Sequence, residues 1–140
     1  ISPAFSQAEV SIEKLTVLIE KDTTNTQLYI KRGNVYLEQG KFFDAAEDYT
    51  TAIELDSGAD QAYFGRGIAL ARQGMIGEGI ADLSVFIKRN PKSSLAYTKR
   101  GVRYMWLQNY SNAEKDLTKA LALDPNNAEA HDDLGVIYAK

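Results

Sequence analysis

The sequence predicts an all-α fold in which short helices pair and then stack along the chain. Three observations support this prediction. Glycines recur every 34 residues, at Gly33, Gly67, Gly101 and Gly135. Apolar residues around them are spaced three and four residues apart, as in amphipathic helices. Glycine and proline residues that end helices fall between these segments. The 140 residues, of which 44% are hydrophobic, are enough for one domain with a continuous core.

The predicted helices follow one another with short connections. Ser6 followed by Glu9 has the spacing of a capping box, which predicts that a helix begins at residue 7. Gly40 and Gly74 are expected to end helices in the left-handed conformation, and Pro91 follows a helix that it cannot continue. We expect no strand. The predicted helices span residues 7–21, 26–39, 42–55, 60–73, 76–89, 94–107 and 110–123, with an eighth from about residue 128.

The 34-residue period extends beyond the glycines. Helices of about 13 residues are marginal in water, so their stability has to come from stacking on neighbours. Equivalent positions of the period hold residues of similar size, namely Tyr29, Tyr63, Tyr97 and His131; Tyr36, Leu70, Tyr104 and Tyr138; Ala45 and Ala113; Tyr49, Leu83 and Leu117; Ala52 and Ala120; Pro91 and Pro125. This pattern resembles the tetratricopeptide repeat family.

The resemblance implies an α-solenoid of 34-residue helix-turn-helix repeats that winds into a right-handed superhelix. The chain is then a single domain of residues 1–140. Residues 7–25 hold the second helix of a preceding repeat, and residues 128–140 hold the first helix of a further one. Full repeats occupy 26–59, 60–93 and 94–127.

A charged pair recurs with the same period. An arginine precedes each of the first three repeat glycines, and an aspartate follows each arginine by 16 residues: Arg32 and Asp48, Arg66 and Asp82, Arg100 and Asp116. We predict an ion pair within each repeat. The alternative is a row of free arginines that binds phosphate groups. The last helix carries Leu134 at the arginine position.

The second repeat departs from the pattern at two positions. Gly79 and Phe86 stand where the other repeats have alanine, seven residues apart on one helix face. We interpret them as a compensating pair, in which the missing side chain at Gly79 opens space for the phenylalanine ring. A functional hinge at Gly77 and Gly79 is the alternative reading.

The residues do not predict an enzyme, a metal site or a cofactor. The single histidine, His131, occupies a packing position where tyrosine stands in the other repeats, which predicts a half-buried structural role. Asp132 and Asp133 are adjacent on a helix and point about 100° apart, so they do not form a paired-carboxylate site. The chain has no cysteine, no cluster of metal ligands and no glycine-rich phosphate loop.

Charge and hydropathy limit the kinds of partner that the sequence favours. A formal net charge of -3 with interleaved basic and acidic residues does not favour nucleic acid. No apolar run is long enough to insert into a membrane. The first residue is Ile1, which suggests a fragment of a longer protein. The compartment stays open, with the cytoplasm slightly favoured.

The resemblance also implies where a partner binds. In this family the first helices line the inside of the curve, and their inward residues form a groove. The expected centre is apolar, at Phe64, Ile68 and Val102, where the core gives no reason for apolar residues. The full set of expected groove residues is Gln27, Ile30, Asn34, Gln61, Phe64, Ile68, Arg72, Leu95, Thr98, Lys99, Val102 and Met105.

The leading hypothesis is therefore a non-catalytic scaffold whose groove binds a peptide or helix of another protein. A subset of the family clamps the C-terminal carboxylate of heat-shock proteins, but this chain matches that clamp only at Asn34 and Lys99. Ile30, Gly65 and Leu95 stand where lysine, asparagine and lysine belong. Two alternatives stay open. The chain could assemble end to end through its unpaired terminal helices, or it could be a non-catalytic module of a larger protein.

Overall fold

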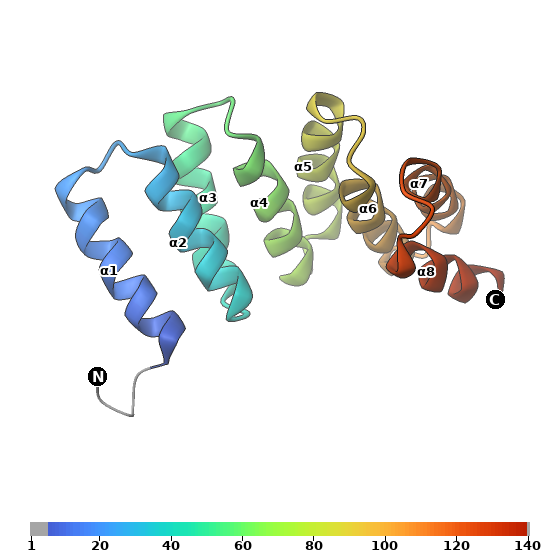
Figure 1. Ribbon diagram of the computed structural model, residues 1–140, viewed down its shortest axis with the longest axis horizontal. Coiled ribbons are helices and arrows are strands. Elements are labelled where there is room, and N and C mark those ends of the chain that lie inside the picture. Colours follow the sequence, from blue (N-terminus) through green and yellow to red (C-terminus); the bar gives the residue numbers. More distant parts are fainter. Residues whose placement is uncertain (1–5, 140) are drawn as a thin grey trace.

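The computed structural model describes residues 6–139, and within this range the chain forms eight α-helices and no strand (Figure 1). The predicted helices are confirmed, and their ends differ from the prediction by at most one residue. The helices are α1 (Gln7–Lys21), α2 (Thr26–Glu38), α3 (Phe42–Leu55), α4 (Asp60–Arg72), α5 (Ile76–Arg89), α6 (Ser94–Trp106), α7 (Tyr110–Leu123) and α8 (Ala128–Tyr138).

The helix ends follow from local chemistry. The Ser6 hydroxyl accepts a hydrogen bond from the Glu9 amide at 3.1 Å, and the Glu9 carboxylate accepts one from the Ser6 amide at 3.3 Å, which confirms the capping box. Gly40 and Gly74 have φ values of 75° and 92°, as expected for residues that follow a helix. Gln108 takes the same conformation, with φ 59°, at the equivalent position of the third repeat. Sequence reasoning did not foresee this, because glutamine rarely adopts it.

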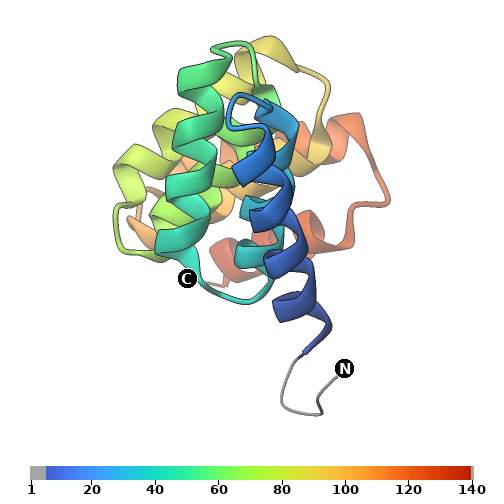
Figure 2. The ribbon, with the colours of Figure 1, turned by 90° about the vertical axis from the view of Figure 1, so that its left-hand side faces the viewer.

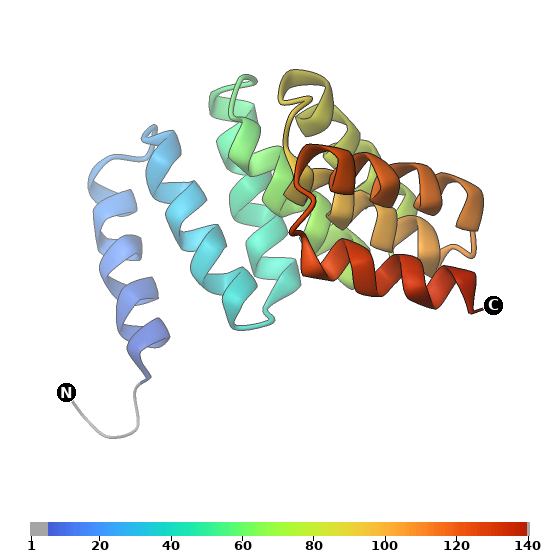
Figure 3. The ribbon, with the colours of Figure 1, turned by 45° about the vertical axis from the view of Figure 1, so that its right-hand side comes forward.

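The helices pair within repeats and form a curved array. The first helices of successive repeats contact one another, α2 with α4, α4 with α6 and α6 with α8, whereas the second helices α3, α5 and α7 make no such contacts. The first helices therefore lie on the inside of the curve. The direction of the helix axes also changes along the array, so that α7 and α8 run in a different direction from α1 (Figures 1 and 3). Figure 2 shows the other helices stacked behind α1.

The two helices of a repeat approach closely at the repeat glycine. A Cβ atom added to Gly67 would lie 2.8 Å from the carbonyl oxygen of Gly79, and one added to Gly33 would lie 2.9 Å from the ring of Tyr49. Both contacts are too short for a real side chain, so only glycine fits. Gly67 and Gly79 face each other across the α4–α5 crossing, which brings these two helices together backbone to backbone.

This crossing changes the interpretation of Gly79 and Phe86. Gly79 is required by the approach of α4, not by Phe86. The Phe86 ring packs instead against Phe64, with ring centroids 5.0 Å apart, and against Ala96 of the next repeat. The two departures from the pattern therefore serve different contacts. Helix α5 continues without a break through Gly77 and Gly79, which gives no support to a hinge there.

The three predicted ion pairs are confirmed. In each pair, Nε and Nη2 of the arginine donate to the two carboxylate oxygens of the aspartate over 2.7–3.0 Å. The hydrogen bond to the aspartate raises the pKa of each guanidinium group, against the opposing effect of burial. The pairs are Arg32 with Asp48, Arg66 with Asp82 and Arg100 with Asp116.

The same arginines also join neighbouring repeats. Nη1 of each one donates to a hydroxyl on the preceding second helix, Arg32 to Thr16 at 3.0 Å and Arg66 to Thr50 at 3.3 Å, and Arg100 does the same with Ser84 at 3.1 Å. Because each of the three guanidinium nitrogens donates a hydrogen bond inside the protein, these side chains do not form a row of free arginines. The phosphate-binding interpretation is therefore wrong.

We expect replacement of Asp82 by alanine to lower the free energy of unfolding by about 2–4 kcal/mol, because it leaves the Arg66 charge partly buried without its anion. Urea denaturation followed by circular dichroism measures this. An Arg66→Met, Asp82→Leu double variant should recover most of the loss, since neither charge then remains. Glu47→Ala on exposed α3 surface is the control. A loss for Asp82→Ala no larger than for this control would show that the pair contributes little.

Candidate partner-binding groove

Five of the residues expected to line the groove are exposed on α2, α4 and α6. Gln27, Asn34, Gln61 and Arg72 are exposed, and Leu95 is 52% exposed. These five side chains come from three successive first helices and are available for contact with another molecule.

The expected apolar centre is only partly open. Phe64, Ile68, Val102 and Met105 are half-buried, as is Lys99 at the groove edge. The Phe64 ring packs against Phe86, and Met105 packs against the core around α7 and α8. These residues divide their surface between the protein's own core and the groove.

Two expected groove residues are covered by the chain itself. Ile30 is 5% exposed and belongs to the core cluster that includes Ala59 and Ala62 at the start of α4. Thr98 is 0% exposed, and its hydroxyl donates to the Ser94 carbonyl and accepts from Asn127 at the start of α8. In both cases the beginning of the next first helix covers this position. The expectation that these groove positions have no role in the protein's own packing is thus wrong at Ile30 and Thr98.

Asn34 is held by a residue that sequence reasoning did not assign to the groove. The hydroxyl of the fully buried Tyr49 donates to the Asn34 side-chain oxygen at 2.6 Å. This bond orients the amide, so its NH2 group is left as a donor on the exposed side. Burial raises the pKa of Tyr49, which keeps the hydroxyl protonated and able to donate.

Tyr49 also explains why Gly65 is glycine. A Cβ atom on Gly65 would fall against the Tyr49 ring, 2.6 Å from its hydroxyl oxygen. The other repeats have Leu83 and Leu117 at the tyrosine position and do not need glycine opposite. Tyr49 and Gly65 both depart from the residues at the equivalent positions of the other repeats. This double departure was the signal in the sequence that could have revealed the contact.

The end of the groove near α8 carries both basic and acidic side chains. Lys99 lies 3.5 Å from Glu129 of α8. Arg103 is 5% exposed, and its Nε has no hydrogen-bond partner among the described residues. Burial lowers the pKa of Arg103, and the nearby Arg72 lowers it further. Burial likewise raises the pKa of Asp133, helped by Glu129 and Asp132. Glu129 was not expected near the groove. Asp133 was considered only together with Asp132, as a carboxylate pair unsuited to catalysis.

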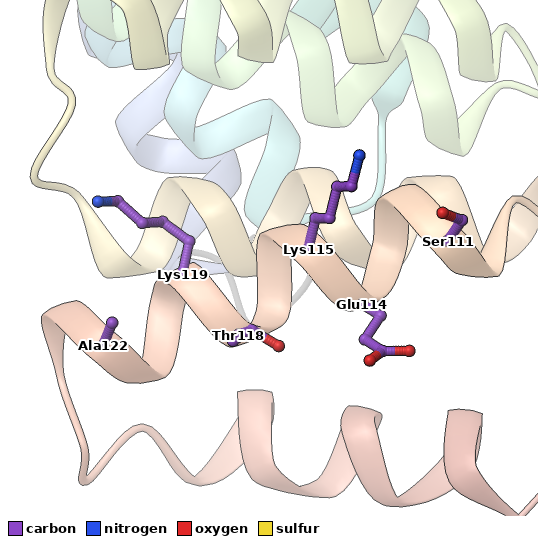
Figure 4. Close-up of a pocket in the computed structure, with 6 residues that line it drawn as sticks. All are labelled: Ser111, Glu114, Lys115, Thr118, Lys119 and Ala122. Carbon is purple, nitrogen blue, oxygen red and sulfur yellow. The ribbon is translucent and has the colours of Figure 1, made fainter.

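A hollow outside the groove lies on α7. The hollow on α7, formed by Ser111, Glu114, Lys115, Thr118, Lys119 and Ala122, is lined by one side of a single helix (Figure 4). Within residues 6–139, no group of three or more histidine, cysteine, aspartate or glutamate side chains could hold a metal ion. None of the described helices has the length and apolar character to span a membrane.

His131 differs from its prediction in one respect. The ring is exposed, not half-buried, because no described helix packs over this side of α8. Its Nε2 lies 2.9 Å from the Pro125 carbonyl oxygen. Tyr29 makes the equivalent contact in the first repeat, where its hydroxyl donates to the Thr23 carbonyl at 2.9 Å. His131 thus makes the same local contact with the preceding turn as Tyr29.

The comparisons with known proteins agree with this architecture. A family model described as TPR repeat matches residues 18–74 and 101–140, and one described as Tetratricopeptide repeat matches residues 61–93. No curated protein sequence matches the chain. Among solved structures, MamA is similar in fold, with 22% identity, a TM-score of 0.87, and coverage of 96% of this chain and 84% of MamA.

Two similar structures are more alike in sequence. The first TPR domain of human RPAP3 is 29% identical, with a TM-score of 0.77, over 81% of this chain and 90% of that domain. The first TPR domain of Spaghetti (RPAP3), bound to the HSP90 peptide SRMEEVD, is 29% identical with a TM-score of 0.78, over 84% of this chain and 94% of that one.

We expect Gly65→Ala to destabilise the protein by about 1–3 kcal/mol, because the added methyl group has to displace the buried Tyr49 ring. Adding Tyr49→Leu should recover much of this loss, since leucine fills the equivalent position in the other repeats. Gly77→Ala is the control: its methyl group meets nothing within 4 Å and should stabilise α5 by about 1 kcal/mol. Thermal unfolding of the four proteins measures these differences. Equal melting of Gly65→Ala and the parent would rule out the packing constraint.

We expect Asp133→Asn to raise the melting temperature by about 2 °C at neutral pH. The folded-state pKa of Asp133 is raised, so its ionisation costs stability as pH rises through that pKa. Asparagine removes this cost. The gain should vanish below the unfolded carboxyl pKa of about 4, where the aspartate is protonated in both states. Exposed Asp132→Asn is the control, and a gain that persists at low pH would contradict the assigned cause.

Proposed function

Because the chain belongs to the tetratricopeptide repeat family, we propose that its concave groove binds a segment of a partner protein and that the chain has no catalytic role. A peptide ligand is supported by the Spaghetti domain, whose structure contains an HSP90 peptide. The second TPR domain of human RPAP3, 26% identical to this chain, is likewise in complex with an HSP70 peptide. The lack of a convergent set of reactive groups in the described groove supports a binding role.

The observation that carries the proposal is the fixed orientation of Asn34. Its side-chain oxygen accepts a hydrogen bond from Tyr49, and the residue is exposed on α2. A rigid amide donor in a groove suits the main-chain carbonyl of an extended segment. A side chain anchored from beneath also loses less conformational entropy on binding than a free one.

The apolar half-buried residues supply the second part of the site. Phe64, Ile68 and Val102 lie on α4 and α6, next to the exposed Leu95. Their ligand-facing surface is limited by packing against the protein's own core. We therefore propose that they contact one or two apolar side chains of the partner, while Gln27, Gln61, Arg72 and Lys99 line the polar edge. Ile30 and Thr98 support this surface from beneath.

The proposed ligand is not held by the carboxylate clamp of the family. Gly65 stands at the second asparagine position of the clamp, and Tyr49 fills the space that an asparagine side chain would need there. Ile30, at the first lysine position, is buried in the core. These two positions therefore lack their side chains for a packing reason, which supports a partner recognised by main-chain and apolar contacts.

The proposal can be tested with a defined probe. Peptides selected on the purified chain from a displayed library of random 12-residue sequences would be synthesised and titrated by fluorescence anisotropy. We expect Asn34→Ala to weaken binding by about 1 kcal/mol, as for the loss of one hydrogen bond. The Phe64→Ala, Ile68→Ala pair should weaken it by about 1–3 kcal/mol.

Two controls separate binding from folding. Glu114→Ala changes the outer face of α7 and should leave affinity unchanged. Thermal unfolding of each variant reports on the core, to which Phe64 also contributes. The groove proposal fails if the Phe64→Ala, Ile68→Ala protein melts several degrees lower yet binds the peptide as tightly as the parent, and Asn34→Ala also binds normally.

A further inference from the structure

Arg103 is buried at a position where the other repeats have an apolar residue. Its equivalents, each 34 residues apart, are Val35, Ala69 and Ile137. Arg103 is 5% exposed, and a guanidinium group taken out of water without an anion costs stability. A basic residue in the last turn of a helix is favourable, but it gains this at the surface too, so the helix end does not require burial. The repeat fold therefore gives no reason for an arginine here.

The guanidinium group of Arg103 has unused donors. Its Nη1 donates to the Lys99 carbonyl oxygen at 3.3 Å. Neither Nε nor Nη2 has an acceptor among the described residues, and of these two atoms only Nε is buried. The group lies over the Trp106 ring, with Cζ 4.6 Å from the ring centroid. Stacking fixes the plane of a guanidinium group and leaves its N–H groups at the edge, where they match the two oxygens of a carboxylate.

Arg72 brings a second guanidinium group to this place. It lies in the last turn of α4, which contacts α6, and its charge lowers the pKa of Arg103. Its Cζ lies 4.9 Å from the centroid of the Phe42 ring. None of the salt bridges between described residues includes Arg72. Two like charges are thus held near each other, each against its own aromatic ring, and an anion between them would relieve their repulsion.

The acidic side chains of α8 are shared with Lys99. Glu129 lies 3.5 Å from Lys99, although its charge also acts on the pKa of Arg103. The charge of Lys99 acts on the pKa of Asp133, where it opposes the rise that burial causes. These two carboxylates do not take up the free donors of Arg103. They do oppose a doubly charged phosphate group more strongly than a singly charged carboxylate.

We propose that Arg72 and Arg103 together bind the carboxylate of an aspartate or glutamate side chain in the partner segment. This inference rests on the proposed peptide-binding function and adds an acidic residue to the ligand. Neither arginine occupies a position of the family's carboxylate clamp. Because that clamp is largely lost at Ile30 and Gly65, we assign the carboxylate to a side chain within the segment and not to a C-terminus.

The position of the arginines predicts where the acidic residue stands in the ligand. Ile68, in the proposed apolar part of the groove, precedes Arg72 by one turn of α4, and Val102 directly precedes Arg103. One helical turn rises about 5.4 Å, and an extended segment advances about 3.3 Å per residue, so the acidic residue should lie about two residues from the apolar one.

The displayed library of 12-residue peptides supplies the probes, which are synthesised with an amidated C-terminus so that only side chains carry carboxylates. We expect the selected peptides to share an aspartate or glutamate near an apolar residue. Replacing that acidic residue with its amide should weaken binding about tenfold, as for the loss of a charge-assisted hydrogen bond. Arg103→Met should weaken binding of the acidic peptide by about the same factor, and the amide replacement should then have no further effect.

Two controls accompany this cycle. Lys115→Met also removes one positive charge, from an exposed position on α7, and should leave the affinity for both peptides unchanged. Arg103→Met should melt no lower than the parent, because methionine puts an apolar side chain where the other repeats have one. In proton–nitrogen correlation spectra, the Nε–H signal of Arg103 is identified by its loss in Arg103→Met. It should move on addition of the acidic peptide and stay in place with the amide peptide.

The proposal is overturned if the selected peptides share no acidic residue, or if the amide replacement weakens binding to the parent and to Arg103→Met equally. A peptide with phosphoserine at the acidic position that binds the parent more than tenfold tighter would identify a phosphate site and also overturn it. If Arg103→Met does not fold, the same cycle with Arg72→Met, at an exposed position, decides.

Failure of the groove itself gives a different result. If the library yields no binder, or binders indifferent to Asn34→Ala and to the Phe64→Ala, Ile68→Ala pair, the groove function fails and the acidic site fails with it. Peptides that depend on these groove residues but show no coupling to Arg103 overturn the acidic site alone.

Discussion

The structure depends on how closely the two helices of each repeat approach. At the α4–α5 crossing, Gly67 and Gly79 bring the two backbones together with no room for a Cβ atom on either residue. In the first repeat the flat ring of Tyr49 occupies the space over Gly33. This approach places the arginine of the first helix beside the aspartate of the second. Short helices that are marginal alone thereby become one stacked array.

The arginine side chains carry this order from one repeat to the next. Arg66 donates forward to Asp82 and back to Thr50, so one half-buried group fixes three helices. Such a network favours a single register of stacking, because a shifted repeat would leave a charge unpaired. The network does not include α8, where Leu134 stands at the arginine position and packs with Leu117 and Ala130. Apolar packing replaces the charged contact there.

Much of the fold was predictable because it repeats. The helix ends and the three ion pairs follow from positions that recur every 34 residues, and each was confirmed. The burial of Ile30 and Thr98 was not predictable in this way, since it depends on how near the next first helix lies. The contact between Tyr49 and Gly65 joins two repeats and breaks the period at both residues. The periodic pattern therefore predicts the scaffold, while contacts between unlike residues of neighbouring repeats decide which groove residues are exposed.

Packing explains several of the residues that depart from the period. Gly65 and Gly79 have a packing reason, because a side chain at either position would enter a neighbouring helix or ring. Leu134, at the arginine position of α8, has one too, since it is 8% exposed and packs with Leu117, Ala120 and Ala130. A departure that packing requires says little about partners.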